Sequence, residues 1–217
     1  MRAMILAAGR GERMKPLSDV TPKPLLKVKG LPLIEWHIKN LKKSGFDEIV
    51  VNIAHLGEKI QEYLEDGSRW GVKIYYSDER EDGALESAGG IRKALHFFDD
   101  TFLVVNGDVF CDYVFDSEFS LDGKLAHLIL VENPQHNKDG DFGVRDNLAL
   151  NSDVKMYTFS GIGYYSVDMF KDLEIKKAPL APLLRDAISK KGVSAEVFTK
   201  MWHDIGTPKR LKEINDE

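Results

Sequence analysis

The sequence predicts an α/β fold, with a Rossmann-like sheet that is mixed but mostly parallel and carries helices on both faces. Three observations predict it. Strand-like and helix-like segments alternate along the chain, a pattern that builds parallel sheets covered by helices. Residues 3–7 form a short apolar run, which is typical of a buried strand. A loop rich in glycine, proline and lysine follows that strand directly, and open α/β sheets bind ligands at this end of their strands.

The elements of the first half follow from periodicity and from stop signals. Residues 33–44 have the pattern of an amphipathic helix, and Gly45 stands where such a helix ends. The apolar run before Asn106-Gly107-Asp108 predicts another buried strand. The expected order is strand 3–7, loop 9–30, helix 33–44, strand 48–53, helix 58–64, strand 72–76, helix 90–98 and strand 102–106.

The pattern changes in the second half, where a polar loop at 133–153 separates two predicted strands, 125–132 and 157–165. We expect this part to be a small insertion that binds a second ligand. Thr207 and Pro208 begin a last helix, because threonine caps helices and proline suits their first position. The elements before it are a helix at 179–190, a strand at 193–198 and a short strand at 201–205.

The composition is that of an ordinary globular protein. The 217 residues are 43% hydrophobic and 30% charged, with a formal net charge of -5. This balance argues against nucleic acid as a partner, because nucleic-acid-binding domains usually carry a basic surplus. No apolar stretch approaches the length of a membrane span. The single cysteine, Cys111, excludes an intrachain disulfide and favours a reducing compartment, so we expect a cytoplasmic protein without a membrane partner.

The loop after the first strand has the composition of an anion site. Gly9 and Gly11 let the backbone turn tightly and bring N–H groups close to an anion. Lys23 stands between two prolines, on a stiff segment suited to a phosphate. The Rossmann fingerprint G-x-G-x-x-G and the P-loop G-x-x-x-x-G-K-[ST] are both absent. From these residues alone, a solvated surface loop without a ligand stays open.

The stretch Gly9-x-Gly11-x-Arg13-Met14-x-Pro16-Leu17, with Lys23-Pro24-Leu25 after it, resembles the signature loop of the sugar-1-phosphate nucleotidyltransferases. The resemblance implies the nucleotidyltransferase fold and a loop that wraps a nucleoside triphosphate. Arg13 and Lys23 match the catalytic arginine and lysine that stabilise the departing pyrophosphate, and we expect both side chains to be exposed in the empty enzyme. The matching nucleotide-binding positions are Ala8, Gly9, Gly11, Glu12, Arg13 and Lys23.

Two aspartates each follow a predicted strand. Asp108 ends an Asn-Gly-Asp tripeptide, and Asp204 lies in Trp202-His203-Asp204-Ile205-Gly206-Thr207. Taken alone, the first sequence is also a common turn and the second aspartate a polar cap. Both segments resemble the family's pattern, which makes Asp108 and Asp204 the Mg²⁺ ligands. Two carboxylates with substrate phosphates suit magnesium. The reaction needs no side-chain nucleophile, because the sugar phosphate attacks the α-phosphorus in line.

Residues 85–90, Leu-Glu-Ser-Ala-Gly-Gly, resemble the family's base-binding stretch. The resemblance implies base contacts at Ala88 and Gly89. The residues themselves leave open an ordinary helix start with Ser87 as its cap.

Two observations bear on the sugar. The segment Asn133-Pro134-Gln135-His136, with Gly140-Asp141-Phe142 after it, is similar to a segment of the N-acetylmuramate-1-phosphate uridylyltransferases. Its composition alone would make it a surface loop, but the resemblance implies that Asp141 contacts the sugar together with Asn106. Many relatives carry a Glu-Lys-Pro stretch whose lysine binds the sugar phosphate. That stretch is missing here, where Lys155 precedes Met156, so the residue that neutralises this phosphate is open.

Together these features predict Mg²⁺-dependent transfer of UMP from UTP to N-acetylmuramic acid 1-phosphate, for recycling of cell-wall sugar. Residues 1–217 then form one domain, with a nucleotide-binding half at 1–110 and most of the sugar site and the second metal ligand in 111–217. One alternative is another acceptor (mannose, glucose or heptose 1-phosphate, or phosphocholine) with GTP, dTTP or CTP. Another is an inactive relative that binds a sugar nucleotide and regulates a partner, which would not need both metal ligands.

Overall fold

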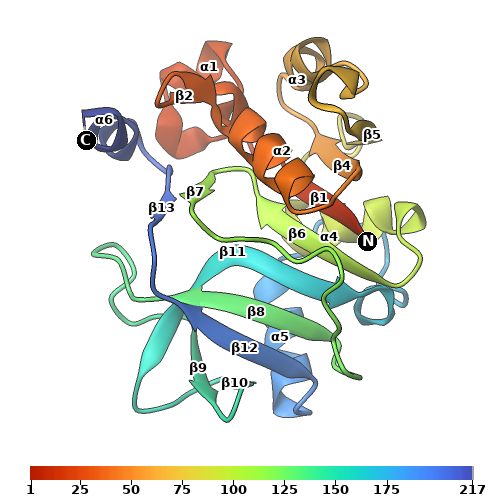
Figure 1. Ribbon diagram of the computed structural model, residues 1–217, viewed down its shortest axis with the longest axis vertical. Coiled ribbons are helices and arrows are strands. Elements are labelled where there is room, and N and C mark those ends of the chain that lie inside the picture. The colour runs from red at the N-terminus through yellow and green to blue at the C-terminus, as the bar shows by residue number, and fades with distance from the viewer. Residues whose placement is uncertain (217) are drawn as a thin grey trace.

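A nine-stranded sheet with helices on both faces forms the centre of the computed structural model (Figure 1). The structure describes residues 1–216, and residue 217, the last of the expected domain, lies outside the described residues. The strand order is β5-β4-β1-β6-β11-β8-β12-β10-β9. The strands are β1 (Arg2–Leu6), β4 (Glu48–Ile53), β5 (Lys73–Asp78), β6 (Thr101–Asn106), β8 (Ala126–Val131), β9 (Phe142–Arg145), β10 (Leu148–Leu150), β11 (Met156–Ser166) and β12 (Val193–Phe198).

The sheet is mixed but mostly parallel, which confirms the predicted fold class. β5, β4, β1 and β6 are parallel neighbours, and β8 and β12 run in the same direction. β11 lies antiparallel between β6 and β8. Because the carboxyl ends of β1, β4 and β6 meet at one edge of the sheet, the loops that follow them surround a common space.

Alternation along the central strands divides the apolar residues between two cores. Ala3 and Ile5 of β1 point into one core, and Met4 between them points into the other. β1 is therefore buried on both faces, as its apolar run predicts. The helices on the first core are α2 (Leu33–Lys43) and α3 (Gly57–Leu64), and those on the second are α4 (Glu86–Ala94) and α5 (Leu180–Ser189).

Two short strands outside the main sheet lead to the last helix. β7 (Val109–Cys111) pairs antiparallel with β13 (Trp202–Asp204), and α6 (Pro208–Asp216) follows β13 (Figure 1). Thr207 Oγ1 accepts the backbone N–H of Arg210 at 3.3 Å, so the predicted cap is confirmed. A small core fixes α6 to the body of the molecule, and its buried members are Val28, Leu33, Ile205 and Ile214.

The loop predicted at 9–30 contains short ordered pieces, each too short to give a periodic signal in the sequence. The longest is α1 (Leu17–Val20), and 3-10 turns lie at Glu12–Met14 and Lys23–Leu25. At its end β2 (Lys27–Val28) pairs with β3 (Leu31–Pro32).

The helix predicted at 90–98 begins earlier, because α4 starts at Glu86. The prediction was wrong there since glycine is a poor helix former, and two glycines in the first turns hid the helix. Tertiary packing requires at least one of them. A Cβ atom at Gly89 would lie 2.2 Å from the carbonyl oxygen of Lys176. This close approach packs the start of α4 against the segment before α5.

The polar loop predicted at 133–153 contains the hairpin of β9 and β10, which the sequence did not reveal. Asp146 and Asn147 form its turn with φ of 51° and 60°. Two consecutive residues with positive φ are typical of a tight hairpin turn, but its usual signal is a glycine in second place. The other predicted strands and helices differ from the observed ones by at most two residues at either end.

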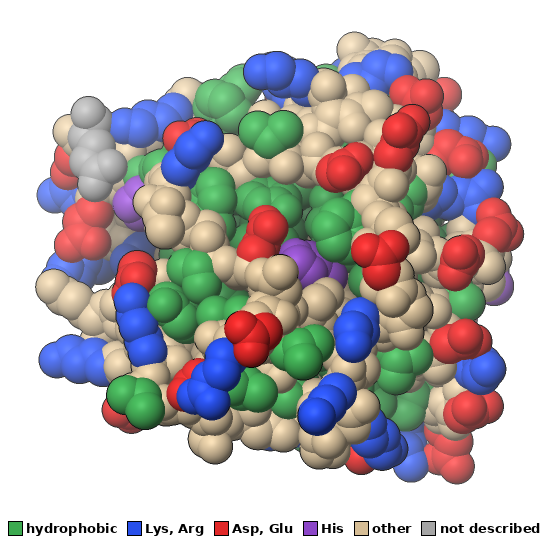
Figure 2. Space-filling model, turned by 60° about the horizontal axis from the view of Figure 1, so that its bottom comes forward, with side chains coloured by type: hydrophobic (Ala, Val, Ile, Leu, Met, Phe, Trp, Pro, Cys, Tyr) green, Lys and Arg blue, Asp and Glu red, His purple; other side chains and the backbone are tan. Residues whose placement is uncertain are grey.

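Acidic and basic side chains are interspersed over the face of the molecule that Figure 2 shows. Within residues 1–216, no helix combines the length and the apolar character needed to cross a membrane.

Candidate active site

A cavity of about 410 Å³ opens at the carboxyl ends of β1, β4 and β6. The three strands supply Leu6, Asn52 and Asn106 to its wall. This is the edge of the sheet where the sequence predicts the nucleotide site. Among the residues predicted to act there, those that line the cavity are Ala8, Gly9, Gly11, Glu12, Arg13, Lys23, Asn106 and Asp108.

The glycine-rich loop is held in its turn by contacts with its own C-terminal part. Gly11 has a φ of 64°, and a Cβ atom there would lie 3.3 Å from Ser18 Cβ and 3.4 Å from Lys23 Cβ, so a side chain is disfavoured on both counts. Ser18 Oγ donates to the Gly11 carbonyl at 2.8 Å. Met14 is fully buried and anchors the loop, whereas the Arg13 side chain next to it is exposed.

Lys23 is already paired in this structure. Its Nζ lies 2.5 Å from Asp108 Oδ2, and its side chain is only 14% exposed. The expectation that Lys23 is exposed in the empty enzyme was therefore wrong, although it holds for Arg13. The 3-10 turn at Lys23–Leu25 and the flanking prolines aim the lysine at the carboxylate.

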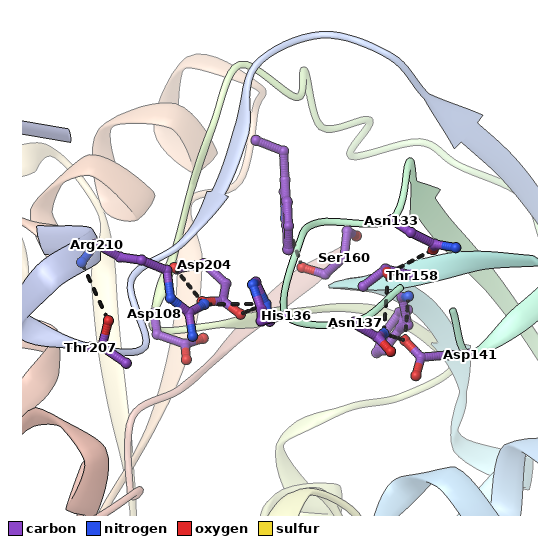
Figure 3. A network of polar contacts seen from close by, with 12 residues as sticks. Asp108, Asn133, His136, Asn137, Asp141, Thr158, Ser160, Asp204, Thr207 and Arg210 are labelled. Atoms are coloured by element: carbon purple, nitrogen blue, oxygen red, sulfur yellow. Dashed lines mark hydrogen bonds and ion pairs between the residues drawn. The ribbon is translucent and has the colours of Figure 1, made fainter. Parts of the chain in front are cut away.

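The pairing of β7 with β13 brings the two predicted metal ligands together. Asp204 lies opposite Val109, and the Ile205 N–H donates to the Asp108 carbonyl at 2.8 Å. Two residues nearly a hundred positions apart in the sequence thus come from neighbouring backbones. Figure 3 shows Asp108, Asp204, His136 and Arg210 gathered in one cluster.

Asp204 has two partners that the sequence did not reveal as functional. His136 Nε2 lies 2.9 Å from Asp204 Oδ2, and the Arg210 guanidinium contacts Oδ1. Arg210 Nη1 also donates to the Asp204 carbonyl at 3.2 Å. Burial, followed by the charges of Arg210 and Arg13, lowers the pKa of His136. His136 stood in the muramate-like segment, but only its tertiary position connects it with the metal carboxylate.

The two carboxylates fit a magnesium ion shared with the substrates. Asp204 Oδ1 is buried and has no hydrogen-bond donor, but the Arg210 guanidinium contacts it, so a cation at this oxygen would displace Arg210. Among the described residues no group of three or more histidine, cysteine, aspartate or glutamate side chains forms a metal site. Magnesium does not need such a cage, because it is commonly held by one or two carboxylates with substrate phosphates and water.

A second cavity, of about 730 Å³, begins where the first one ends. Asp204, His136 and Arg210 line it, together with Glu132 and Trp202. Asp108 belongs to the first cavity and Asp204 to the second, so the pair of carboxylates stands at their junction. This arrangement suits a reaction between two ligands that meet at a metal ion.

A buried polar relay supports the wall of the first cavity. Ala7 N–H donates to Asn52 Oδ1 at 2.6 Å, and Asn52 Nδ2 donates to Glu79 Oε1 at 2.7 Å. The second carboxylate oxygen of Glu79 accepts the Leu85 N–H at 2.8 Å. Burial raises the pKa of Glu79. The relay connects the start of the glycine-rich loop with the turn before α4, and no pattern in the sequence indicates it.

Ala88 and Gly89 do not line either cavity. Both are buried, and their N–H groups donate to the Ala178 carbonyl at 3.0 and 3.2 Å. Those N–H groups are therefore engaged within the protein. The residues of the same turn that do line the first cavity are Ala84, Glu86 and Ser87.

Asp141 organises the loop in which it stands. Its Oδ2 accepts the Phe159 N–H at 2.8 Å and the Asn137 side-chain amide at 3.1 Å, and Asn137 also donates to Thr158 at 3.1 Å (Figure 3). These bonds fix the 133–141 segment against β11. Asp141 lies outside the lining of both cavities, whereas Asn106 lines the first.

Comparisons with known proteins agree with this arrangement. Residues 2–145 match the family described as "Nucleotidyl transferase". The N-acetylmuramate alpha-1-phosphate uridylyltransferase of Neisseria meningitidis serogroup B is 51% identical over an alignment 223 residues long. The alignment covers 98% of this chain and 96% of that protein. The D-glycero-alpha-D-manno-heptose 1-phosphate guanylyltransferase of Campylobacter jejuni is 30% identical, and 96% of each chain is covered.

Solved structures share the fold. A putative glucose-1-phosphate thymidylyltransferase of Bacillus anthracis superposes with a TM-score of 0.83 at 22% identity, covering 100% of this chain and 94% of the other. HddC of Yersinia pseudotuberculosis, in complex with GMP-PN, gives a TM-score of 0.80 at 22% identity, covering 99% and 98% of the two chains.

Proposed function

Because this chain belongs to the nucleotidyl transferase family, we propose that it transfers UMP from UTP to N-acetylmuramic acid 1-phosphate and releases pyrophosphate. The observation that carries the choice of substrate is the 51% identity to a uridylyltransferase of that specificity, over nearly the whole length of both chains. The aligned region covers 98% of this chain and therefore includes the segment around His136 and Asp204, which line the second cavity. An inactive binding protein would have no need of the paired carboxylates at the junction.

The phosphate loop binds the triphosphate in this proposal. Arg13 and Lys23 both line the first cavity and neutralise the charge that develops on pyrophosphate as it departs. The backbone N–H groups of the loop, around Gly9 and Gly11, hold the phosphates in place. Lys23 must exchange its partner Asp108 for a phosphate oxygen when UTP enters.

Asp108 and Asp204 would hold Mg²⁺, which when bound would neutralise negative charge on the reacting phosphates. The protein otherwise orients two anions that repel each other, so that the acceptor phosphate approaches the α-phosphorus in line.

The turn at Ala84–Ser87 forms the wall of the nucleotide site near the base, and Ala88 and Gly89 build that turn. Asn106 faces the site, and Asp141 keeps the acceptor loop in shape.

The product is a sugar nucleotide of the bacterial cell wall, and the proposed role is recycling of its sugar. We place the reaction in the cytoplasm, which supplies the nucleoside triphosphate. The lone cysteine, Cys111, is free and buried, which fits a reducing compartment. Residues 1–110 form the nucleotide half, and the later residues supply most of the acceptor half.

The test is release of pyrophosphate over a grid of four nucleoside triphosphates and several sugar 1-phosphates. N-acetylmuramic acid 1-phosphate with UTP should give the highest kcat/KM. N-acetylglucosamine 1-phosphate lacks the lactyl carboxylate and should be worse by at least ~10-fold, since about one polar contact is left unmade. Asp108→Asn, and the wild type in EDTA, should give no turnover. A preference for mannose, glucose or heptose 1-phosphate would overturn the substrate, and no turnover with any pair would overturn the activity.

A further inference from the structure

Each of the two metal carboxylates holds a cationic side chain in this structure. Lys23 is paired with Asp108, and Arg210 is in contact with Asp204. The two pairs stand at the junction of the cavities, with Lys23 lining the first and Arg210 lining the second. A divalent cation that binds both carboxylates competes with both side chains. The proposed reaction brings two anions to the same junction, and Lys23 is assigned to only one of them.

The acceptor phosphate needs a cation of its own, because Arg13 and Lys23 serve the triphosphate. Lys155 stands closest in sequence to the place of the missing lysine, but it lines neither cavity. Its side chain is 60% exposed, pairs with Glu132 at 2.8 Å and lies over the Tyr157 ring. Lys177 lines the first cavity, but it lies beside Glu86, at the turn that bounds the nucleotide site.

Arg210 has the position and the chemistry that the acceptor phosphate requires. Its side chain is 22% exposed, so the guanidinium is largely shielded from water. It lines the second cavity and contacts Asp204, so it lies beside the two carboxylates. A guanidinium can donate two parallel hydrogen bonds to a phosphate, and such bonds strengthen when solvent is excluded.

The backbone of Arg210 is fixed independently of its partner. Thr207 Oγ1 accepts its N–H in the first turn of α6, and α6 is anchored through buried Ile205 and Ile214. Only the long side chain needs to move for the guanidinium to leave Asp204. His136 Nε2 lies 3.2 Å from Arg210 Nη1, on the loop that borders the second cavity. The arginine is therefore held at the cavity wall by Asp204, with His136 beside both.

We propose that Arg210 binds the phosphate of the acceptor sugar phosphate, and that Asp204 holds Arg210 ready until a divalent cation takes the carboxylate. This assignment rests on the proposed function, and it replaces the lysine that the sequence lacks. Metal binding and acceptor binding are then linked. With a cation bound at Asp204, the Arg210 guanidinium would be released from this carboxylate and could bind the doubly charged acceptor phosphate.

The first measurement is the KM of each substrate. Arg210→Gln should raise the KM for N-acetylmuramic acid 1-phosphate by at least ~10-fold, the scale of one lost charged hydrogen bond, and leave the KM for UTP within about twofold. Arg210→Lys keeps the charge without the fork and should fall between the wild type and Arg210→Gln. Lys212→Gln, at an exposed position of the same helix that lines neither cavity, is the matched control and should change neither constant.

The second measurement does not depend on turnover. Mn²⁺ binding to the enzyme without substrates, followed by the electron paramagnetic resonance signal of the free ion, should be several-fold tighter in Arg210→Gln. The reason is that no guanidinium competes for Asp204 in that variant. Unaltered or weaker Mn²⁺ binding would overturn the exchange, and an unaltered acceptor KM would overturn the phosphate contact, while the proposed function would stand. If the wild type turns over no acceptor at all, the proposed function fails, and the Mn²⁺ measurement still decides whether Arg210 and metal compete.

Discussion

Lys23 is paired with Asp108 in the structure, and in the proposed mechanism it acts on the triphosphate. In this structure its ammonium lies 2.5 Å from Asp108, and both side chains are partly buried. Lys23→Ala should slow turnover by roughly two orders of magnitude or more, as expected for loss of a charge contact in the transition state. It should also lower the free energy of unfolding by roughly 1 kcal/mol, because Asp108 then loses its cation.

Arg13→Ala is the control for this second effect, because its exposed side chain makes no comparable pair in the described residues. It should slow turnover to a similar degree and leave the melting temperature unchanged. Steady-state kinetics and thermal unfolding of the two variants check both claims. Full turnover by Lys23→Ala would make the lysine a structural residue.

His37 should make the protein less stable in acid. It lies on α2, is 3% exposed, and its Nε2 has no hydrogen-bond partner. Burial lowers the pKa of His37 from 6.5 to about 4. The folded state therefore resists protonation, so the stabilising contribution is complete above pH 6.5 and is lost as the pH falls towards 4. A shift of this size corresponds to roughly 3 kcal/mol.

Urea unfolding at several pH values measures this contribution. The wild type should lose stability between pH 6.5 and 4.5 that His37→Leu does not lose, by roughly 2–3 kcal/mol. His96→Gln, at an exposed histidine, should follow the wild type. Parallel curves for the wild type and His37→Leu would show that His37 is not responsible.

The sequence predicted which single residues line the first cavity where a motif lies at the end of a strand. Arg13, Lys23, Asp108 and Asn106 all line the cavity at the predicted edge of the sheet. It could not locate partners that meet only through the fold. Asp204 and His136 are far apart in the chain, and their contact depends on how the 133–141 loop packs beside β13. The roles of these residues in binding stay predictions.

At the scale of elements, the hydrogen bonds of the relay between the ends of β1 and β4 and the start of α4 converge on Glu79. Ala7 N–H donates to Asn52, Asn52 donates to Glu79, and Glu79 accepts from Leu85. Glu79→Gln should break it, because the new amide nitrogen faces another donor whichever way it is turned. The expected loss is ~1–3 kcal/mol of unfolding free energy, with a KM for UTP raised by about tenfold.

A second substitution should restore the relay. In the double variant Asn52→Asp, Glu79→Gln, the new carboxylate accepts from Ala7 and from the new amide, whose oxygen accepts from Leu85. Both the stability and the KM for UTP should move back towards the wild type, as a double-mutant cycle would show. A double variant that is worse than the sum of the two single variants would disprove the assigned direction of the bonds.

Element boundaries were predictable where one periodic signal dominates. β4 and β12 have the predicted ends, because β4 is mostly apolar, β12 begins with alternating apolar and polar residues, and both lie between polar turns. α4 was placed too late, since its two glycines serve close packing and not helix formation: Gly89 lies against the Lys176 carbonyl, and Gly90 lies against the side chains of Glu79 and Asn52. β7 was missed because a three-residue strand has no period, and its partner β13 lies at the other end of the chain.

At the scale of the whole molecule, chelation of metal should abolish turnover without loosening the fold. Sites whose carboxylates face one another unpaired become less stable when the metal is removed. Here Lys23 and Arg210 already neutralise Asp108 and Asp204 in the absence of metal. EDTA should therefore shift the melting temperature by no more than about one degree. In Lys23→Ala the same treatment should have a larger effect, because Asp108 has lost its side-chain cation.

The mostly parallel arrangement of the sheet was predictable from the alternation of strands and helices. The antiparallel position of β11 between β6 and β8 was not. Both β6 and β11 are apolar strands buried on two faces, and a buried run carries no signal of its direction. Only the pairing itself, with β11 between β6 and β8, makes the two halves one continuous sheet.

The pairing of β13 with β7 also determines when, during translation of the chain, the complete site can form. The phosphate loop and Asp108 leave the ribosome early, and β1, β4 and β6 can assemble around them as they emerge. Asp204 and Arg210 emerge much later, on β13 and α6. In a growing chain, the residues around the first cavity are thus made long before Asp204 and Arg210 of the second cavity. In the proposed mechanism, nucleotidyl transfer has to wait until Arg210 has emerged and β13 has paired with β7.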